Sequence, residues 1–326
     1  MPAGGGVVAK VRIGVAATGG DARAVLDRIV DLERAGIDAA WLTTGGAGID
    51  GMTVLAAAAA RTERIMLGTS IIPSWPRHTI VVVKQAQVVA RLAPGRLRVG
   101  IGPSHRPTIE STFGYRFTAP LGHLREYVRI VRDLLHTGAV DFDGKHYTAH
   151  ARIAVPIPDV PVMASALRAQ SFRYCGRETD GAISWVCPAE YLRDVALPEL
   201  RRGAEEAGRA VPPLIAHMPV CVHEEPREVA GAVREQLATY PRLPFYAQMF
   251  ADAGFPEAQR NAQWSEPMID AVVAHGDELT VATRLRQVLQ WGATEVLVSV
   301  VTAGPDRGRS WERSIRLVAG MSQAAS

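Results

Sequence analysis

His105 is the residue of this chain whose chemistry is best suited to moving a proton. It follows the apolar segment 96–102, within the polar sequence Ser104-His105-Arg106. An unperturbed histidine titrates near neutral pH, so His105 could transfer a proton or donate a hydrogen bond to an oxyanion. A loop histidine that only orients the backbone is the alternative. The position after an apolar segment and the neighbouring arginine favour the catalytic interpretation.

Small polar residues end two other apolar segments in the same way. Thr43 leads into a glycine-rich loop where a flat ligand could approach the backbone closely, although simple turn chemistry explains this sequence equally well. Ser70 lies within the segment 66–72, where its hydroxyl could contact a ring. Either residue could also serve only to cap a loop.

The segment after residue 161 ends in a sequence that suits an anion. Ser165 and Ala166 lead into Arg168 and Ala169, where the pattern predicts the start of a helix. Free N–H groups at a helix start, together with an arginine, favour a phosphate, although an exposed helix residue explains Arg168 almost equally well. Trp185, at the end of a later apolar segment, could stack on a ligand ring or fill the end of a barrel.

These candidates are positioned by apolar segments, expected to be strands, that alternate with amphipathic segments, expected to be helices. The expected strands are 11–17, 39–43, 66–72, 96–102, 161–167, 181–186, 214–222 and 294–301. The expected helices are 21–35, 51–60, 77–92, 120–136, 168–178, 189–207, 226–239, 278–291 and 308–321.

Eight buried strands, each followed by a helix, indicate a parallel sheet covered on both faces. An open doubly wound sheet is the competing architecture, but it usually has about six strands and a GxGxxG turn after the first, which this chain lacks. We therefore expect an α/β protein with a TIM (β/α)8 barrel, whose site lies at the carboxyl ends of the strands.

Two segments interrupt the alternation and are expected to be insertions. Residues 138–160 contain Asp143-Gly144 between short alternating runs, which predicts a β-hairpin. Residues 241–266 are rich in proline and aromatic residues, and could form a lid, an apolar substrate wall or a dimer contact.

Composition excludes several classes of protein. The net charge of +3 is small and dispersed, which argues against nucleic acid as a partner. No apolar run is long enough to cross a membrane, no signal peptide is apparent, and three cysteines without metal spacing suggest a reduced cytoplasmic protein. Because neither a metal-binding pattern nor a GxSxG elbow occurs, an organic cofactor is expected to perform the chemistry.

The motifs LGTSIIPSWPRH (67–78), APGRLRVGIGPSHR (93–106) and DGAISW (180–185) resemble the luciferase-like monooxygenase superfamily, in its actinobacterial branch dependent on coenzyme F420. The stretches 218–226 and 242–254 support this resemblance, which covers essentially the whole chain. It implies one luciferase-like barrel domain over 1–326 that forms a homodimer. It also implies a cis peptide bond at Ser70-Ile71 behind the cofactor ring, and a phosphate loop after the fifth strand.

In the same resemblance, His105 falls where some relatives carry a proton-donating glutamate. The chain departs from several relatives in two places, with Arg168-Ala169 in place of Gly-Pro and Thr44-Gly45 in place of Asp-His. The catalytic candidate is therefore His105. The cofactor-binding candidates are Thr43, Ser70, Ile71, Ser104, Ser165, Ala166, Arg168, Ala169 and Trp185.

Three functions follow from the residues and the resemblance. The first is an F420-dependent oxidoreductase that transfers a hydride between the deazaflavin and a small organic substrate. The second is an FMN-dependent monooxygenase of the same superfamily. The third is a catalytically silent barrel retained as a subunit or binding partner.

Overall fold

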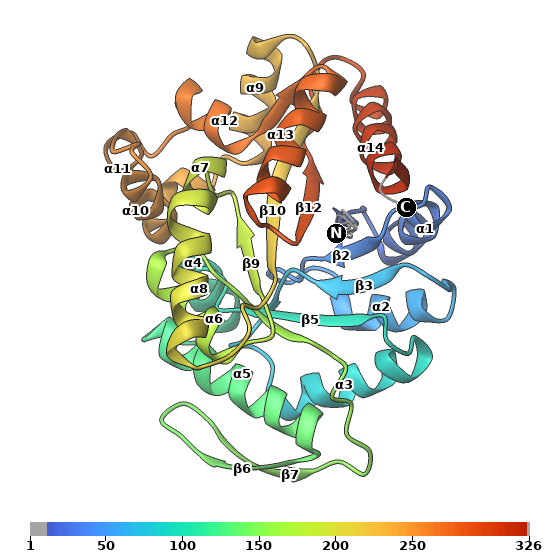
Figure 1. Cartoon of the computed structure of the whole chain (residues 1–326), viewed down its shortest axis with the longest axis vertical. Helices are drawn as coiled ribbons and strands as arrows, with labels where there is room; N and C mark the ends of the chain where they lie inside the picture. The colour runs from blue at the N-terminus through green and yellow to red at the C-terminus, as the bar shows by residue number, and fades with distance from the viewer. Residues whose placement is uncertain (1–11, 325–326) are drawn as a thin grey trace, which may run out of the picture.

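Eight parallel strands close into a barrel in the computed structural model, which describes residues 12–324 (Figure 1). Each strand pairs with its neighbour in the order β1-β2-β3-β5-β8-β9-β10-β12, and β12 pairs with β1 to complete the ring. The predicted TIM barrel is therefore confirmed. The strands are β1 Arg12–Ala16, β2 Ala39–Leu42, β3 Met66–Thr69, β5 Leu97–Gly102, β8 Val162–Ser165, β9 Ala182–Trp185, β10 Leu214–Val222 and β12 Glu295–Val300.

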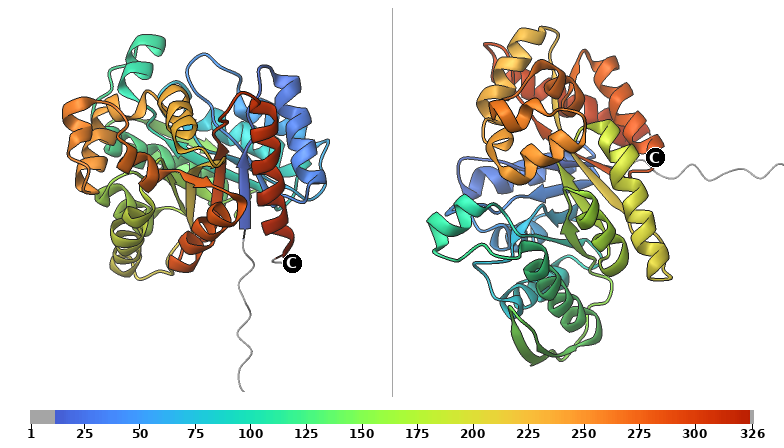
Figure 2. Two further views of the ribbon diagram at one scale, coloured as in Figure 1. Left: turned by 90° about the horizontal axis from the view of Figure 1, so that it is seen from above. Right: turned by 90° about the vertical axis from the view of Figure 1, so that its left-hand side faces the viewer.

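Amphipathic helices surround the barrel (Figure 2). In α5 the buried residues Leu124, Val128, Val131 and Leu135 recur at helical spacing, and the helix ends at Gly138, whose φ of 81° suits glycine. The main helices are α1 Ala22–Arg34, α2 Gly51–Ala59, α3 Thr79–Leu92, α5 Pro120–Thr137, α6 Ala169–Glu178, α8 Leu197–Glu206, α9 Pro226–Gln236, α13 Glu278–Trp291 and α14 Arg307–Ala324.

The observed elements differ from the predicted ones in five places. The strand expected over 66–72 is split into β3 and the short β4 (Ile72–Pro73), which pairs with β5. The helix expected over 189–207 is three pieces, α7 Ala189–Tyr191, a π-helix over Leu192–Ala196 and α8. Helices α4 (Arg106–Phe113) and α12 (Glu266–Val272) and strand β11 (Ala274–Gly276) were not predicted, because short elements show too little periodicity. Val11 and the amino-terminal residues lie outside the described part of the chain.

The two expected insertions have different structures. The first contains the predicted hairpin, in which β6 (Ala139–Asp143) pairs antiparallel with β7 (Thr148–Arg152). Its strands are joined by residues 144–147, so the connection is longer than the two-residue turn that Asp-Gly suggested. The second contains a 3-10 turn (Tyr240–Arg242) and the helices α10 (Pro244–Asp252) and α11 (Glu257–Asn261).

A buried polar group fills the amino-terminal part of the barrel. Arg98 pairs with Glu295, with 2.6 Å between Nη1 and Oε2, and Trp41 donates its indole N–H to the same carboxylate at 2.7 Å. The indole fits because Gly68 and Gly14 face it, and a Cβ at either position would lie within 2.7 Å of the ring. Trp41 also belongs to an apolar cluster with Met163, Ile183, Ile215 and Leu297.

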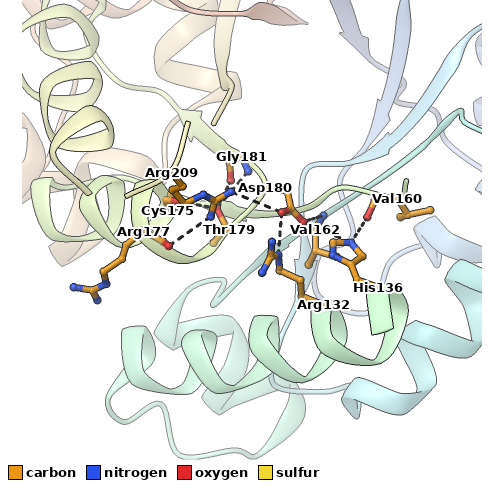
Figure 3. Close-up of polar contacts among 10 residues, drawn as sticks. All are labelled: Arg132, His136, Val160, Val162, Cys175, Arg177, Thr179, Asp180, Gly181 and Arg209. Atoms are coloured by element: carbon orange, nitrogen blue, oxygen red, sulfur yellow. Dashed lines mark hydrogen bonds and ion pairs between the residues drawn. The ribbon is translucent and has the colours of Figure 1, made fainter. Parts of the chain in front are cut away.

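Asp180 ties helix α5 to the amino end of β8, on the side opposite the expected site (Figure 3). Its carboxylate accepts hydrogen bonds from Arg132 Nε and from the Val162 N–H, each at 2.9 Å. His136 donates from Nε2 to the Val160 carbonyl at 2.9 Å. The DGAISW motif therefore begins with a structural residue at one end of the barrel and ends with Trp185 at the other.

No helix within residues 12–324 is long and apolar enough to cross a membrane. The three cysteines are free and buried.

A ring of hydrogen bonds anchors the β6–β7 hairpin to the loop after β4. Tyr147 donates its hydroxyl proton to the Ser74 carbonyl at 2.6 Å, so it must accept the 2.9 Å hydrogen bond from His123 Nε2. The Nδ1 atom of neutral His123 then accepts from the Ser74 hydroxyl at 3.1 Å. Burial, with a smaller effect of His146, lowers the pKa of His123 to about 4.

We expect acid to destabilise the fold through His123. The unfolded chain binds this proton near the ordinary histidine pKa and the folded chain only near pH 4, so stability is lost as the pH falls from 7 to 4. The loss should be about 2–3 kcal/mol. Urea unfolding of the wild type and His123→Asn at pH 7 and pH 4.5 measures it. The free energy of unfolding should fall less between pH 7 and pH 4.5 in the variant than in the wild type. An equal fall in both proteins would contradict the prediction.

Candidate active site

The chain bulges at the carboxyl end of β3, where the Ser70-Ile71 peptide bond is cis as predicted. Thr43 donates its hydroxyl to the Ser70 carbonyl at 2.8 Å, and the Thr44 N–H donates to the Ile71 carbonyl at 3.2 Å. Ile71 packs against the apolar barrel interior. The structure therefore places Thr43 as a support of the bulge, with its hydroxyl proton already engaged.

Two hydroxyl-bearing residues lie around this bulge. The buried Ser70 hydroxyl has no hydrogen-bond partner among the described residues. Ser165 lies beside Gly102, because a Cβ on that glycine would be 2.5 Å from Ser165 Oγ and 2.8 Å from Ile71. Gly102 thus permits Ser165 and Ile71 to approach one another. Ser70 and Ile71 follow β3 and Ser165 ends β8, with only β5 between these two strands, and the sequence predicted all three residues for one site.

His105 follows β5 through a left-handed residue, Ser104, whose φ is 60°. It immediately precedes α4, and its side chain makes no hydrogen bond within the described chain. Burial lowers the pKa of His105, which favours the neutral ring at pH 7. The neighbouring Arg106 is paired with Glu110 at 3.1 Å. His105 is therefore a neutral imidazole whose two nitrogens are free to act on a ligand.

A cluster of aromatic rings adjoins His105. The ring centroids of Tyr246 and Tyr240 lie 5.7 Å and 6.2 Å from that of His105, both edge-on. Tyr240 also lies 5.6 Å from Trp185, the last residue of β9. We call His105, Trp185, Tyr240 and Tyr246 the aromatic wall. Tyr240 was missed in the sequence because it precedes the expected insertion by one residue.

A second histidine lies beneath Trp185. The ring of His217, in β10, is 4.0 Å from that of Trp185, and its Nε2 is 2.7 Å from the hydroxyl of Ser299 in β12. Burial lowers the pKa of His217 to about 3, so this ring is neutral as well. The hydrogen bond to Ser299 gives this buried histidine a polar partner, and its place beside Trp185 brings it to the carboxyl end of the barrel.

The start of α6, directly after β8, has the features of an anion site. Arg168 donates from Nε to Asp252 at 3.0 Å, and its guanidinium makes no other side-chain hydrogen bond or ion pair within residues 12–324. Burial raises the pKa of Tyr191, whereas Arg168 and the Ala169 N–H, both close to the Tyr191 hydroxyl, oppose that rise. This buried hydroxyl has no partner in the part of the chain that the structure describes.

Two further observations concern this helix start. Ser171 Oγ accepts the backbone N–H groups of Leu167 and Arg168, each at 3.0 Å, which fixes the loop. A π-helix begins directly after Tyr191, and such segments are common at functional sites. Ala166 packs into the core outside the barrel, so only its backbone could contact a ligand.

The fold and the arrangement at its carboxyl end define a luciferase-like barrel with a bulged third strand. The sequence profile of the luciferase-like monooxygenase family matches residues 4–295, and the chain belongs to this family. No group of three or more His, Cys, Asp or Glu residues suited to a metal ion occurs over residues 12–324.

Several known proteins are similar to this chain. An F420-dependent glucose-6-phosphate dehydrogenase of Nocardia farcinica is 32% identical over 209 residues, which are 58% of this chain and 61% of that protein. An F420-dependent secondary alcohol dehydrogenase has a similar structure, with a TM-score of 0.80 at 17% identity, covering 97% of this chain and 99% of that one.

A flavin enzyme shares the fold to a similar degree. The oxygenating constituent of 3,6-diketocamphane monooxygenase from Pseudomonas putida, in complex with FMN, has a TM-score of 0.70 at 17% identity. The similarity covers 97% of this chain and 98% of that one. At these identities the two structures establish the common fold.

Proposed function

We propose that this protein is an oxidoreductase that binds coenzyme F420 and transfers a hydride between it and a small organic substrate. The anion site at the start of α6 is the observation that carries the proposal. Its helix N–H groups, the unpartnered Tyr191 hydroxyl and the terminal nitrogens of Arg168 suit a phosphate, which F420 contains. The F420-dependent relative supports the choice of this cofactor.

The residues next to the anion site also suit a flat ring. Ser165 ends β8, the strand that leads into α6, and the bulge at Ser70-Ile71 follows β3, two strands away in the barrel. The Ser70 hydroxyl is free to donate to a ring oxygen or nitrogen. Gly102 lets Ser165 and Ile71 pack closely together at this place. When bound, F420 supplies a carbon that accepts or donates a hydride.

The protein's own contribution to the reaction is a proton transfer and the exclusion of water. When an alcohol is oxidised, its C–H bond gives up a hydride and its O–H bond gives up a proton. The neutral imidazole of His105 accepts that proton, and protonated His105 returns it in the reverse direction. Trp185, Tyr240 and Tyr246 exclude water on one side of the imidazole.

An FMN-dependent monooxygenase is the second candidate. The structural similarity to the FMN-bound camphane enzyme favours it, and FMN also carries a phosphate that the start of α6 could bind. The two candidates share the anion site and differ in the ring beside Ile71.

Titration of the pure protein with F420 and with FMN tests the proposal. We expect F420 to bind and Arg168→Gln to raise its Kd about 10- to 100-fold, because a charge-assisted hydrogen bond contributes about 1.5–3 kcal/mol. The matched control is Arg173→Gln, on the same helix, whose guanidinium pairs with Glu206 on the exposed surface. This control should leave the Kd within about twofold.

The other outcomes are equally informative. Binding of FMN without F420 would replace the first candidate by the second. Binding of neither cofactor would indicate the catalytically silent barrel. Equal loss of affinity in the Arg168 and Arg173 variants would contradict the assignment of the phosphate to the start of α6.

A further inference from the structure

Residues 240–252 form a strap across the carboxyl ends of three neighbouring strands. Tyr240 and Tyr246 contact His105, which follows β5, and Tyr240 also contacts Trp185 at the end of β9. Asp252, at the other end of the strap, pairs with Arg168, which follows β8. Helix α10 accordingly lies on the same side of the barrel as α6 and α8 (Figure 1). Because β8 lies between β5 and β9, the strap passes over the end of β8.

The strap is held in place by its own apolar residues. Met249 and Phe250 are completely buried, and Phe250 packs edge-on against Trp264 at 5.3 Å. Asp252 is held by Arg168 and by Gln248, whose amide donates to it at 2.8 Å. The strap is thus anchored at the carboxyl end of α10, and the buried Tyr246 lies within the same helix.

The chemistry of the aromatic wall is neutral. Three of its four members are phenol or indole rings, and the fourth is the neutral imidazole of His105. Of the three arginines that follow strand ends nearby, Arg106 pairs with Glu110 and Arg77 pairs with Asp50. Arg168 pairs with Asp252 and belongs to the anion site at the start of α6. Aromatic edges and faces attract other rings and apolar groups, whereas a carboxylate or phosphate beside them loses its hydration without gaining a partner.

We propose that the strap forms the substrate side of the site and selects uncharged carbonyl compounds or alcohols that carry an apolar ring, rather than phosphorylated or carboxylated substrates. The proposal rests on the proposed function, because it takes His105 as the group that meets the substrate oxygen. Tyr240 and Tyr246 are then specificity-determining residues: their rings pack against the substrate ring while His105 meets its oxygen.

The test uses two probes that differ by one charged group, acetophenone and 4-acetylbenzoate, with glucose 6-phosphate as a third. Binding to the F420-loaded protein is measured by saturation-transfer NMR, and turnover by the oxidation of reduced F420. We expect acetophenone to bind more tightly than either anion. Removing one ring of the wall, in Tyr246→Ser or Tyr240→Ser, should raise its Kd about 5- to 10-fold.

Matched variants separate this effect from general disruption. Tyr246→Phe keeps the ring and should bind acetophenone like the wild type. Phe245→Ser removes a neighbouring ring on α10 that is 48% exposed and contacts Phe117 instead of the wall, so it should also bind normally. Tyr240→Ser, in the 3-10 turn, replaces Tyr246→Ser if the latter does not fold.

The outcomes distinguish the two proposals. Tighter binding of either anion, no binding of acetophenone, or an equal effect of Phe245→Ser and both tyrosine-to-serine variants would overturn the substrate proposal, even if F420 binds. If F420 does not bind, but acetophenone does and its binding depends on Tyr240 or Tyr246, the role of the aromatic wall is supported and the cofactor assignment is wrong.

Discussion

Replacing His105 by asparagine is expected to lower kcat by about 10²- to 10⁴-fold, the usual contribution of a positioned general acid or base. Asparagine keeps a polar side chain of similar size in the aromatic wall but cannot accept and release a proton at neutral pH. The Kd for F420 should change little, because His105 is separate from the anion site at Arg168. Single-turnover oxidation of reduced F420 by a carbonyl substrate measures the effect.

The pH dependence gives a second readout of the same residue. In the direction of alcohol oxidation the neutral imidazole is required, so kcat/KM should rise as the pH increases through the pKa of His105. Because burial lowers that pKa, the rise should occur at a lower pH than for an ordinary histidine. His105→Asn should lose this rising limb.

His217 is the alternative group that could exchange the proton with the substrate. Its variant therefore gives the result that would contradict the assignment to His105. His217 is neutral, it packs against Trp185, and it lies near the same end of the barrel. If His105→Asn retains activity while His217→Asn loses it together with the pH dependence, the assignment of the proton transfer to His105 is wrong.

Replacing Arg98 by methionine is expected to destabilise the fold by about 3–5 kcal/mol, because it leaves the Glu295 carboxylate buried without its cationic partner. Both side chains are almost completely buried, and Trp41 donates only one hydrogen bond to the carboxylate. Urea unfolding at pH 7 measures the free energy. The double variant Arg98→Met with Glu295→Leu should recover part of the loss, since it removes the unpaired charge.

A surface pair serves as the control for this prediction. Arg61 pairs with Asp27 at 3.2 Å, but both side chains are about half exposed. Arg61→Gln should therefore cost no more than about 1 kcal/mol. If Arg98→Met and Arg61→Gln lower the free energy of unfolding by similar amounts, the prediction that the buried partner of Glu295 matters more to stability than a surface pair is wrong.

The location of the candidate site could be predicted because strand ends are local features. Apolar segments bounded by small polar residues placed His105, Ser165 and Trp185 at the carboxyl ends of β5, β8 and β9, and the structure puts them there. The resemblance to the family added the cis bond at Ser70-Ile71, which the structure confirms. The homodimer inferred from the same resemblance stays a prediction.

By itself the sequence determined the order of strands and helices, and hence the barrel, because hydrophobic periodicity and helix-ending residues act over a few positions. The tertiary structure decided which side chains meet across the barrel. Arg98 and Glu295 are 197 positions apart and Arg168 and Asp252 are 84 apart. Such contacts produce no periodic pattern in the sequence, because it is the closure of the barrel and the course of the strap that bring these residues together. The insertion 241–266 was expected as a lid, an apolar wall or a dimer contact, but the contacts of Tyr240 and Tyr246 with His105 and of Asp252 with Arg168 could be seen only in the fold.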